Sequence, residues 1–324
     1  MTLKRIISCR AYEHRGWFQI VWEWENILGN ILKIPIKTPG NKPFRLRRLL
    51  RYLGFPLFQF GTSVEFIMDG SPIDRRNIRR NTIPWIIDYF LSEEATKKFI
   101  QSLSKVPLAL ISSKEAYERI LSLGGSKLNI RHLGLSLPDY WMPESENDWG
   151  NKDYDLILIG RISEGFTKYI NRYIQSHPNM SVAIRRMENG HYNFYSQKDC
   201  SVLVGNADTR EEYIKLLKRS RAFIYTTPGI DGDKSTNGFS QVTPRFLEAL
   251  ACGCNPVMKY ADNADTRWYE LSMFGPSVEN YDDFEQQMDK AISTSPNFNK
   301  ISNYLSKHLT SIRAKELNEL LSQI

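Results

Sequence analysis

The sequence is poor in cysteine and histidine and has no long apolar run. Only four cysteines and five histidines occur among its 324 residues. The cysteines, Cys9, Cys200, Cys252 and Cys254, show no metal-ligand spacing, so they predict buried reduced thiols rather than a zinc site or a disulfide framework. No apolar run approaches the ~20 residues of a membrane-spanning helix, and the apolar stretch at the N-terminus is too short for a signal peptide. These absences predict a cytoplasmic globular protein.

Positive charge is concentrated in the first half of the chain. The formal net charge is +7, and residues 1–150 hold 22 Lys and Arg against 15 Asp and Glu. Residues 44–60 mix arginines with leucines and aromatics, and residues 75–80 hold four more arginines. The first segment is typical of peripheral contact with an anionic membrane, and a solvated helix followed by a buried strand is the alternative. No nucleic-acid-binding motif accompanies the charge, so nucleic acid is not expected as a partner.

The length and the order of elements predict two α/β domains. A chain of 324 residues exceeds the usual size of one core. Strands alternate with helices in both halves, which favours parallel sheets, and a polar, acidic stretch separates the halves. We therefore expect domains at 1–150 and 151–324. Strands are expected at 1–9, 83–90, 108–112, 129–133, 154–161, 181–184, 201–205, 222–227 and 256–258, and helices at 92–103, 114–123, 167–176, 208–219, 243–252 and 303–324.

The most informative segment is residues 243–258. Thr243 and Pro244 suit the start of a helix, because the hydroxyl can cap it and proline lacks an N–H that would be unpaired there. The apolar residues that follow recur at helical spacing, and a short apolar run after the helix predicts a buried strand. Arg245 and Glu248 are charges on this otherwise apolar helix, which is unusual unless a polar group meets them.

Residues 248–258, Glu-Ala-Leu-Ala-Cys-Gly-Cys-Asn-Pro-Val-Met, resemble the donor-nucleotide helix of GT-B glycosyltransferases. Residues 243–248, Thr-Pro-Arg-Phe-Leu-Glu, are similar to the branch related to spore-maturation glycosyltransferases. The resemblance implies an α/β GT-B fold with two Rossmann-like doubly wound domains facing a cleft, and a C-terminal helix that can cross back. It also implies that domain 1–150 binds the acceptor and that domain 151–324 binds a nucleotide-diphosphate sugar.

The same resemblance assigns the ribose hydroxyls of the nucleotide sugar to Glu248. The larger family carries a second glutamate eight positions earlier, where this chain has Ser240. Glu248 is therefore expected to act without that partner.

The glycine-containing loop 228–241 precedes the helix and is expected to approach a diphosphate. Gly238 permits a close approach of the backbone. Helix N-termini offer unpaired N–H groups and the positive end of the helix dipole to anions. The donors expected here are the backbone N–H groups of Ser240, Gln241, Val242 and Thr243, together with the side chain of Arg245.

Further donor-binding residues are expected at the ends of earlier strands. Arg161 follows Gly160 at the end of strand 154–161, where the resemblance implies an arginine that neutralises the diphosphate. Lys168 is the nearest match to the lysine of the family. By the same resemblance, Gly205 and Asn206 are expected near the base and Thr227 on the path to the donor.

Catalytic candidates lie in the first domain. Asp88 ends the strand 83–90, where a carboxylate can deprotonate an acceptor hydroxyl. It would act as the base in an inverting transfer and as a positioning group in a retaining one, and the sequence leaves both open. Glu13 and His14 follow the first strand and are alternative bases.

No cofactor and no metal site is expected, because acidic triplets are missing unless Asp231 and Asp233 serve. Cationic side chains would stabilise the leaving diphosphate instead. We predict a metal-independent, hexosyl-type glycosyltransferase acting on a lipid-linked glycan, in bacterial surface polysaccharide (O-antigen or capsule) assembly at the inner face of the plasma membrane. The alternatives are a DNA-modifying glycosyltransferase or sugar-nucleotide epimerase of the same fold, and a non-catalytic nucleotide-sugar-binding protein.

Overall fold

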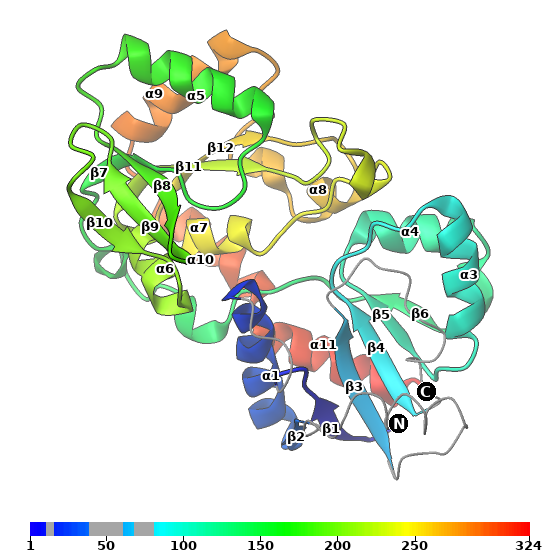
Figure 1. Cartoon of the computed structure of the whole chain (residues 1–324). Coiled ribbons are helices and arrows are strands. Elements are labelled where there is room, and N and C mark those ends of the chain that lie inside the picture. Colours follow the sequence, from blue (N-terminus) through cyan, green and yellow to red (C-terminus); the bar gives the residue numbers. More distant parts are fainter. Residues whose placement is uncertain (11–15, 39–60, 68–80) are drawn as a thin grey trace. The chain divides into compact units, whose positions relative to one another are not determined.

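The computed structural model describes residues 1–10, 16–38, 61–67 and 81–324, and their contacts divide the chain into two compact units (Figure 1). Unit 1 comprises Met1–Pro138, Ser235–Phe239 and Thr310–Ile324, and unit 2 comprises Asp139–Lys234 and Ser240–Leu309. A short piece of the loop 228–241 and the C-terminal helix therefore belong to unit 1. Glu13, His14 and the basic segments 44–60 and 75–80 lie outside the described residues.

The core of unit 1 is a six-stranded sheet whose pairings are all parallel, in the order β2-β1-β3-β4-β5-β6. The chain adds strands on both sides of β1, which is the doubly wound arrangement. Ligands of such sheets bind at the carboxyl ends of the strands. The strands are β1 (Leu3–Ile7), β2 (Ile36–Lys37), β3 (Thr62–Ile67), β4 (Thr82–Ile86), β5 (Ala109–Ile111) and β6 (Ile130–His132).

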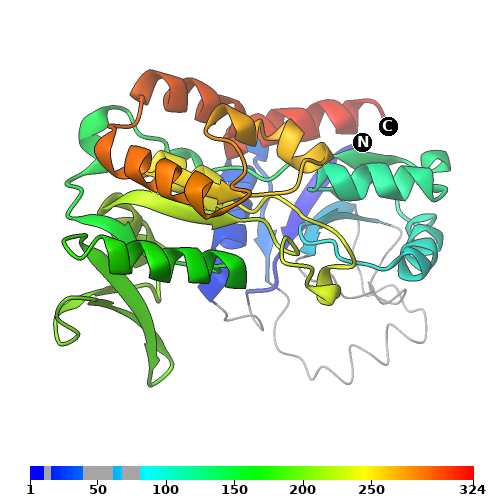
Figure 2. The same cartoon turned by 90° about the horizontal axis from the view of Figure 1, so that it is seen from above.

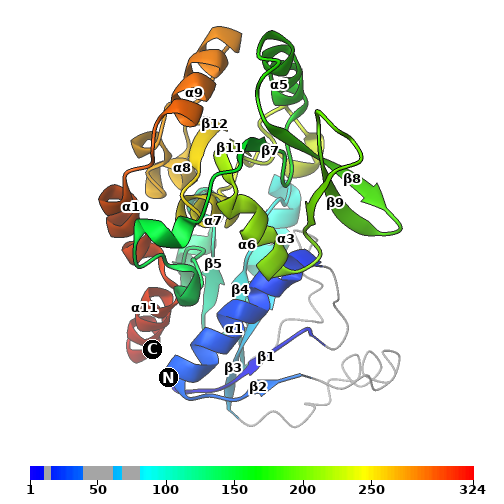
Figure 3. The same cartoon turned by 90° about the vertical axis from the view of Figure 1, so that its left-hand side faces the viewer.

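The helices of unit 1 begin where the sequence supplies caps. The hydroxyl of Ser92 accepts a hydrogen bond from the Ala95 N–H (3.2 Å), and that of Ser113 accepts one from the Ala116 N–H (3.2 Å). Helices α1 and α11 pack against each other (Figure 3). The helices are α1 (Gln19–Leu32), α3 (Glu93–Leu103), α4 (Lys114–Ser122) and α11 (Thr310–Ser322).

Unit 2 has a six-stranded sheet in the order β10-β9-β8-β7-β11-β12. Strands β8, β7, β11 and β12 pair in parallel, whereas β9 is antiparallel to both of its neighbours. The strand order reverses between β7 and β11. The strands are β7 (Tyr154–Ile157), β8 (Val182–Glu188), β9 (His191–Ser196), β10 (Leu203–Asn206), β11 (Ser220–Thr226) and β12 (Asn255–Lys259).

The β8–β9 hairpin corrects the expectation of a purely parallel sheet in the second half. The predicted strand 181–184 continues to Glu188, and β9 was not predicted at all. Asn189 and Gly190 form the turn with φ angles of 52° and 85°. A two-residue hairpin turn with both φ angles positive is of the type that favours Asn-Gly, so Asn189-Gly190 is a local sequence signal for this hairpin.

Helices cover both faces of this sheet. On one face, α5 and α9 lie side by side (Figure 2). They pack through Phe166 and Phe284, whose ring centroids are 5.3 Å apart. On the other face α6 and α7 are neighbours. Cys252 and Cys254, just after α7, are buried thiols as predicted, whereas Cys200 is exposed. The helices are α5 (Glu164–Ser176), α6 (Arg210–Lys218), α7 (Arg245–Ala251), α8 (Ala264–Trp268), α9 (Tyr281–Ser293) and α10 (Phe298–Leu305).

The predicted single helix 303–324 is wrong, because the structure breaks it in two. Helix α10 ends at Leu305 in unit 2, residues 306–308 form a 3-10 turn, and Leu309 is extended. Thr310 then starts α11, and both its N–H and its hydroxyl donate to the carbonyl oxygen of Leu137 (3.0 and 3.1 Å). This anchoring returns the chain to unit 1. No helix in the described part of the chain combines the length and apolar character needed to cross a membrane.

His132, at the end of β6, is a histidine that the fold keeps neutral. Its Nε2 lies 3.1 Å from the carbonyl oxygen of Ser112. Desolvation by burial, with the nearby charges of Lys114 and Arg313, lowers the pKa of His132 to about 3. Between that value and the unfolded pKa of about 6.5, only the unfolded state binds the extra proton. Neutral His132 therefore makes its full contribution to the free energy of unfolding above pH ~6.5, and this contribution is lost as the pH falls below that value.

We expect this histidine to make unfolding easier in mild acid. The free energy of unfolding should fall by about 2 kcal/mol between pH 7.5 and pH 5, and His132→Gln should remove that part of the loss. Urea unfolding of the parent and the variant at both pH values measures it. His177→Gln, which changes a histidine whose side chain is 38% exposed, is the control. Equal pH dependence in the parent and His132→Gln would contradict the assignment.

Candidate functional site

The carboxyl edge of the unit 2 sheet gathers most of the predicted donor-binding residues. Arg161 follows β7, Thr227 follows β11, and Asn206 ends β10. Because β7, β10 and β11 run in the same direction, their ends meet at one edge of the sheet. Helix α7, which carries Arg245 and Glu248, begins beyond this edge (Figure 1).

Arg245 packs on the backbone of Gly160 and joins β7 to β11. Gly160 has a φ of +86°, and a Cβ there would lie 2.6 Å from Cζ of Arg245. Nη1 of Arg245 donates to the carbonyl oxygen of Arg161 (3.0 Å), and Nη2 donates to that of Ile224 (3.4 Å). The guanidinium also lies over the ring of Phe223, 5.5 Å from its centroid. Only glycine at position 160 permits this arrangement, because any side chain would displace the guanidinium.

Glu248 forms a buried ion pair with Arg210, the first residue of α6. Oε1 of Glu248 lies 2.6 Å from Nη2 of Arg210, and Glu248 is 2% exposed. Tyr213 lies in the same cluster, where burial first and then the charge of Glu248 raise its pKa well above the usual value. Arg210 was not among the residues predicted from the sequence. The Thr209 and Glu212 capping box places it at the start of α6, but its pairing with a distant glutamate leaves no mark in the sequence.

The segment 240–243 is held by internal hydrogen bonds. The Val242 N–H donates to Oδ2 of Asp265 (2.6 Å), and the Thr243 N–H donates to the hydroxyl of Tyr225 (2.9 Å). In this structure both predicted diphosphate-binding N–H groups therefore have protein acceptors, and the prediction that they face a diphosphate stays a prediction. Asp265 and Tyr225 supply these acceptors, which only the tertiary structure brings together.

Ser240 and Gln241 belong to the same held segment. The hydroxyls of Ser240 and Thr227 lie 2.5 Å apart, and the carbonyl oxygen of Ser240 accepts a hydrogen bond from the Asn263 side chain (3.0 Å). Ser240, Gln241 and Thr227 are all buried. The contacts of Ser240 with Thr227 and Asn263 therefore hold the backbone that leads into α7.

Arg161, predicted to bind the diphosphate, is accessible to solvent. Its side chain is 58% exposed and pairs with Asp233 (2.9 Å). Asp231 of the same loop accepts a hydrogen bond from the Glu164 N–H at the start of α5 (2.9 Å). Lys168 lies on the exposed face of α5 and pairs with Glu164 (3.2 Å), so the structure does not bring it into the group around Gly160.

Gly205 and Asn206 lie at the end of β10, close to α6. A Cβ at Gly205 would lie 3.1 Å from Cδ2 of Leu216, and the Asn206 amide faces the Glu212 carboxylate. Arg185, which was not predicted, comes from β8, the neighbour of β7. Nη1 of Arg185 donates to the carbonyl oxygen of Gly160 (3.4 Å).

The remaining predicted residues belong to unit 1. Asp88 follows β4 at the carboxyl edge of its sheet and is partly exposed. The segment Ser235–Phe239 packs beside it, since Asn237 donates to the carbonyl oxygen of Phe90 (2.6 Å) and Phe239 meets Tyr89 edge to face. Gly238 thus lies near the neighbours of Asp88 and is not grouped with the donor-binding residues of unit 2.

The edge of unit 2 is chemically suited to an anion with several oxygens. Four guanidinium groups gather there, and planar forks of N–H donors match phosphate oxygens in pairs. Two carboxylates, those of Glu248 and Asp233, are set among them. The arginines are Arg161, Arg185, Arg210 and Arg245. Within residues 1–10, 16–38, 61–67 and 81–324, no group of three potential metal ligands is present.

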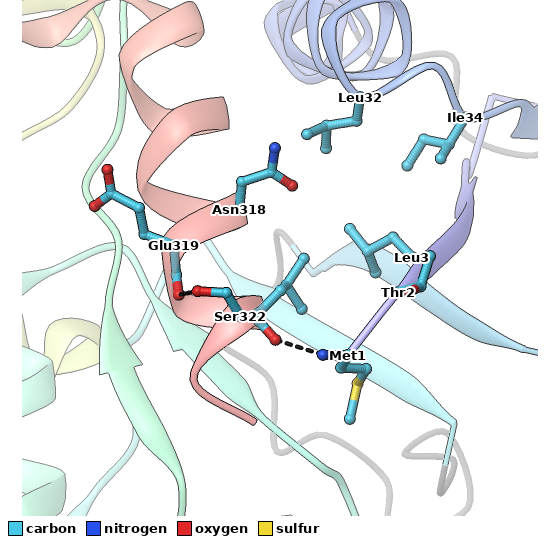
Figure 4. Close-up of a pocket in the computed structure, with 9 residues that line it drawn as sticks. Met1, Thr2, Leu3, Leu32, Ile34, Asn318, Glu319 and Ser322 are labelled. Atoms are coloured by element: carbon cyan, nitrogen blue, oxygen red, sulfur yellow. Dashed lines mark hydrogen bonds between the residues drawn. The ribbon is translucent and has the colours of Figure 1, made fainter.

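A pocket of about 510 Å³ lies elsewhere, in unit 1, where the start of β1 meets α1 and α11 (Figure 4). The N-terminal ammonium donates to the carbonyl oxygen of Leu321 there (2.5 Å). None of the predicted site residues lines it. The lining residues are Met1, Thr2, Leu3, Leu32, Ile34, Asn318, Glu319, Leu321 and Ser322.

We expect Asp265 to be essential for holding the segment 240–243. Asp265→Ala should lower the free energy of unfolding by about 2–3 kcal/mol, because it leaves the buried Val242 N–H without its acceptor. Asp262→Ala, three residues away in an exposed pair with Arg267, should cost less than about 0.5 kcal/mol. Urea unfolding compares the two. Similar losses for both variants would show that the anchor contributes little.

Comparison with solved structures identifies the fold. The chain is similar to HepE from Anabaena in complex with UDP and glucose, at a TM-score of 0.62, 11% identity and 100% of both chains. It is similar to AviGT4, a glycosyltransferase involved in avilamycin A biosynthesis (0.60, 12%, 98% of this chain and 97% of that one), and to the lipopolysaccharide outer core galactosyltransferase WaaB (0.54, 13%, 100% of both). No family model and no curated protein matches the sequence. With two Rossmann-like units and these neighbours, the chain has the GT-B glycosyltransferase fold.

Proposed function

We propose that this protein is a glycosyltransferase that moves a sugar from a nucleotide-diphosphate sugar to a glycan acceptor. The observation that carries the proposal is the group of arginines around Gly160, set beside the buried Glu248 at the carboxyl edge of the unit 2 sheet. A diphosphate needs dense positive charge, and a ribose needs a fixed acceptor. The fold presents both at the edge where such sheets bind nucleotides.

Arg161 is the proposed ligand of the leaving diphosphate. It exchanges Asp233 for the phosphate oxygens, and it neutralises the charge that grows as the bond from the sugar C1 to the diphosphate breaks. Arg245 supports it by holding the Arg161 carbonyl and the Gly160 backbone in place. Since side-chain cations supply this charge, we propose that transfer proceeds without a divalent cation.

Glu248 is the proposed acceptor of the ribose hydroxyls. Its Oε1 lies 2.6 Å from Nη2 of Arg210, so the side chain already meets a polar N–H group in the structure. Glu248 is 2% exposed, and Arg210 is its ion-pair partner. We infer that donor binding turns Arg210 away from Glu248, which makes both the carboxylate and the guanidinium available to the donor.

Unit 1 is the proposed acceptor-binding domain, with Asp88 as the leading base. In an inverting transfer the acceptor oxygen attacks C1, the bond to the diphosphate breaks, and the hydroxyl proton passes to the Asp88 carboxylate. The complex of HepE with UDP and glucose makes UDP-sugars the first donors to test. The likeness to WaaB, named as a lipopolysaccharide galactosyltransferase, supports a hexosyl transfer in surface polysaccharide assembly.

The central test compares two arginines that have similar side-chain exposure and an aspartate as ion-pair partner. Arg161→Gln should lower kcat/KM for the nucleotide sugar about 100-fold, because the variant lacks the positive charge that stabilises the leaving diphosphate. Arg267→Gln should leave it unchanged, since Arg267 is similarly exposed (62%) and similarly paired, with Asp262 at 2.7 Å. Release of nucleoside diphosphate from a panel of nucleotide sugars, with a glycan acceptor, measures the rate.

The same assay tests the cation requirement when it is run in EDTA and then in Mg²⁺. Equal rates support the proposed role of the arginines. A rate that is lost in EDTA and restored by Mg²⁺ would contradict cation independence. Equal kcat/KM in Arg161→Gln and the parent would remove Arg161 from the site. If no nucleotide sugar is consumed and none raises the melting temperature, the proposed function fails.

We also propose that the acceptor is carried on a lipid and that the protein contacts the anionic inner face of the plasma membrane. The charge of residues 1–150 and the composition of residues 44–60 support this. The protein should float with vesicles that contain an anionic phospholipid at low salt and be released at high salt. Vesicles of neutral phospholipid are the control. Protein that stays at the bottom of the gradient in both cases would contradict membrane contact.

A further inference from the structure

The antiparallel strand β9 places an aromatic residue at the ligand-binding edge of unit 2. Because β9 runs against its neighbours, its first residues lie where β8 and β10 end. In register, Tyr192 pairs with Met187 near the end of β8, and Asn193 pairs with Asn206, the last residue of β10. Tyr192 is therefore at the carboxyl edge of the sheet, where the proposed donor binds.

The backbone of Tyr192 is fixed to the segment that leads into α6. Its N–H donates to Oδ1 of Asp208 (3.1 Å), and its carbonyl oxygen accepts a hydrogen bond from the Ala207 N–H (3.0 Å). The neighbouring His191 reaches the other oxygen of Asp208 (2.6 Å). The hairpin is thus joined to the start of α6, two residues before Arg210.

The side chain of Tyr192 is half open to solvent and points to the same group of arginines. Its ring is approached by the guanidinium of Arg185, whose Cζ is 5.2 Å from the ring centroid. Arg185 also donates to the carbonyl oxygen of Gly160 (3.4 Å). Tyr192 is 40% exposed, which leaves aromatic surface uncovered.

These contacts form a closed circuit of neighbouring residues at the carboxyl edge of the unit 2 sheet, which we call the donor rim. It runs from Gly160 through the hairpin to α6, on to α7, and back to Gly160. The proposed ribose ligand Glu248 is part of it, and the proposed diphosphate ligand Arg161 is adjacent to it in sequence, next to Gly160. The rim consists of Gly160, Arg185, Tyr192, Asp208, Arg210, Glu248 and Arg245.

We propose that Tyr192 is the stacking surface for the nucleobase of the donor. This inference rests on the proposed function, since it takes Glu248 as the ribose ligand. The base is attached to the ribose and must extend from Glu248 away from the diphosphate at Arg161. In that direction the rim presents Arg210, then the Asp208 segment, then the exposed ring of Tyr192. A base stacked on an aromatic ring gains affinity whatever its identity, because every base has a π-face.

Arg185 is the positioning residue for this ring. Its guanidinium donates a hydrogen bond to the carbonyl oxygen of Gly160 and lies over the ring of Tyr192. The guanidinium thus holds the ring in place, and its cation–π contact strengthens the ring as a stacking partner. The hairpin offers a matched pair on its other face, where Arg186 lies 5.0 Å from the centroid of Tyr195. The hydroxyl of Tyr195 is held by Glu188 (2.7 Å), and strand alternation turns Tyr195 away from the rim.

The test measures the affinity of the full chain for UDP, ADP and inorganic pyrophosphate by isothermal titration calorimetry. Tyr192→Ala should weaken both nucleoside diphosphates by about tenfold to a hundredfold and leave pyrophosphate unchanged. Tyr192→Phe should retain the affinity of the parent, because the ring remains. Tyr195→Ala, on the opposite face, should change none of the three. Thermal unfolding of each variant shows whether the hairpin stays folded.

The outcomes separate this inference from the function on which it rests. Nucleoside diphosphate affinity that is equal in Tyr192→Ala and the parent overturns the stacking role alone. A loss in Tyr192→Phe as large as that in Tyr192→Ala also overturns it, since stacking does not need the hydroxyl. Equal losses for pyrophosphate and UDP in Tyr192→Ala would assign the residue to the phosphates instead. A parent that binds neither nucleoside diphosphate overturns the proposed function together with this inference.

Discussion

The structure of unit 2 depends on the contact between the guanidinium of Arg245 and the backbone of Gly160. That contact joins the end of β7 to β11 and to the first residue of α7, three elements that are distant in sequence. It needs a residue without a side chain at position 160, with a positive φ, and a planar cation at position 245. Arg161 takes its place from the same contact, because its carbonyl oxygen is one of the acceptors.

A second constraint is electrostatic. Four arginines at one edge repel one another unless anions are near, and the fold meets this with Glu248 on one side and Asp233 on the other. The two pairs differ in kind. Glu248 is buried and the Arg210 side chain is only 14% exposed, so breaking this pair would carry a large desolvation cost for Glu248. Arg161 and Asp233 are exposed, so separating them costs little free energy. The turning of Arg210 away from Glu248 that we propose would therefore have to be offset by contacts with the bound donor.

Much of this could be predicted because local signals agree with the fold. Ser92 with two acids in the first turn predicts α3, and the structure has the cap there. The continuous apolar run before Gly160 predicts the central strand of a parallel sheet. The β8–β9 hairpin was missed although Asn189-Gly190 is a local signal, because the apolar runs on either side favoured separate strands of a parallel sheet. The break between α10 and α11 has no such signal, since it depends on the distant carbonyl oxygen of Leu137.

The sequence by itself determined the α/β class and the resemblance to GT-B enzymes. It also placed Arg161, Arg245 and Glu248 near the ends of strands and helices, because periodicity and capping act over a few residues. Only the tertiary structure decided the partners of these charges. Arg210 meets Glu248, Asp265 takes the Val242 N–H, and Tyr192 reaches the edge of the sheet through an antiparallel strand. Those pairings join residues many positions apart, and their energies come from burial and distance, which no local pattern records.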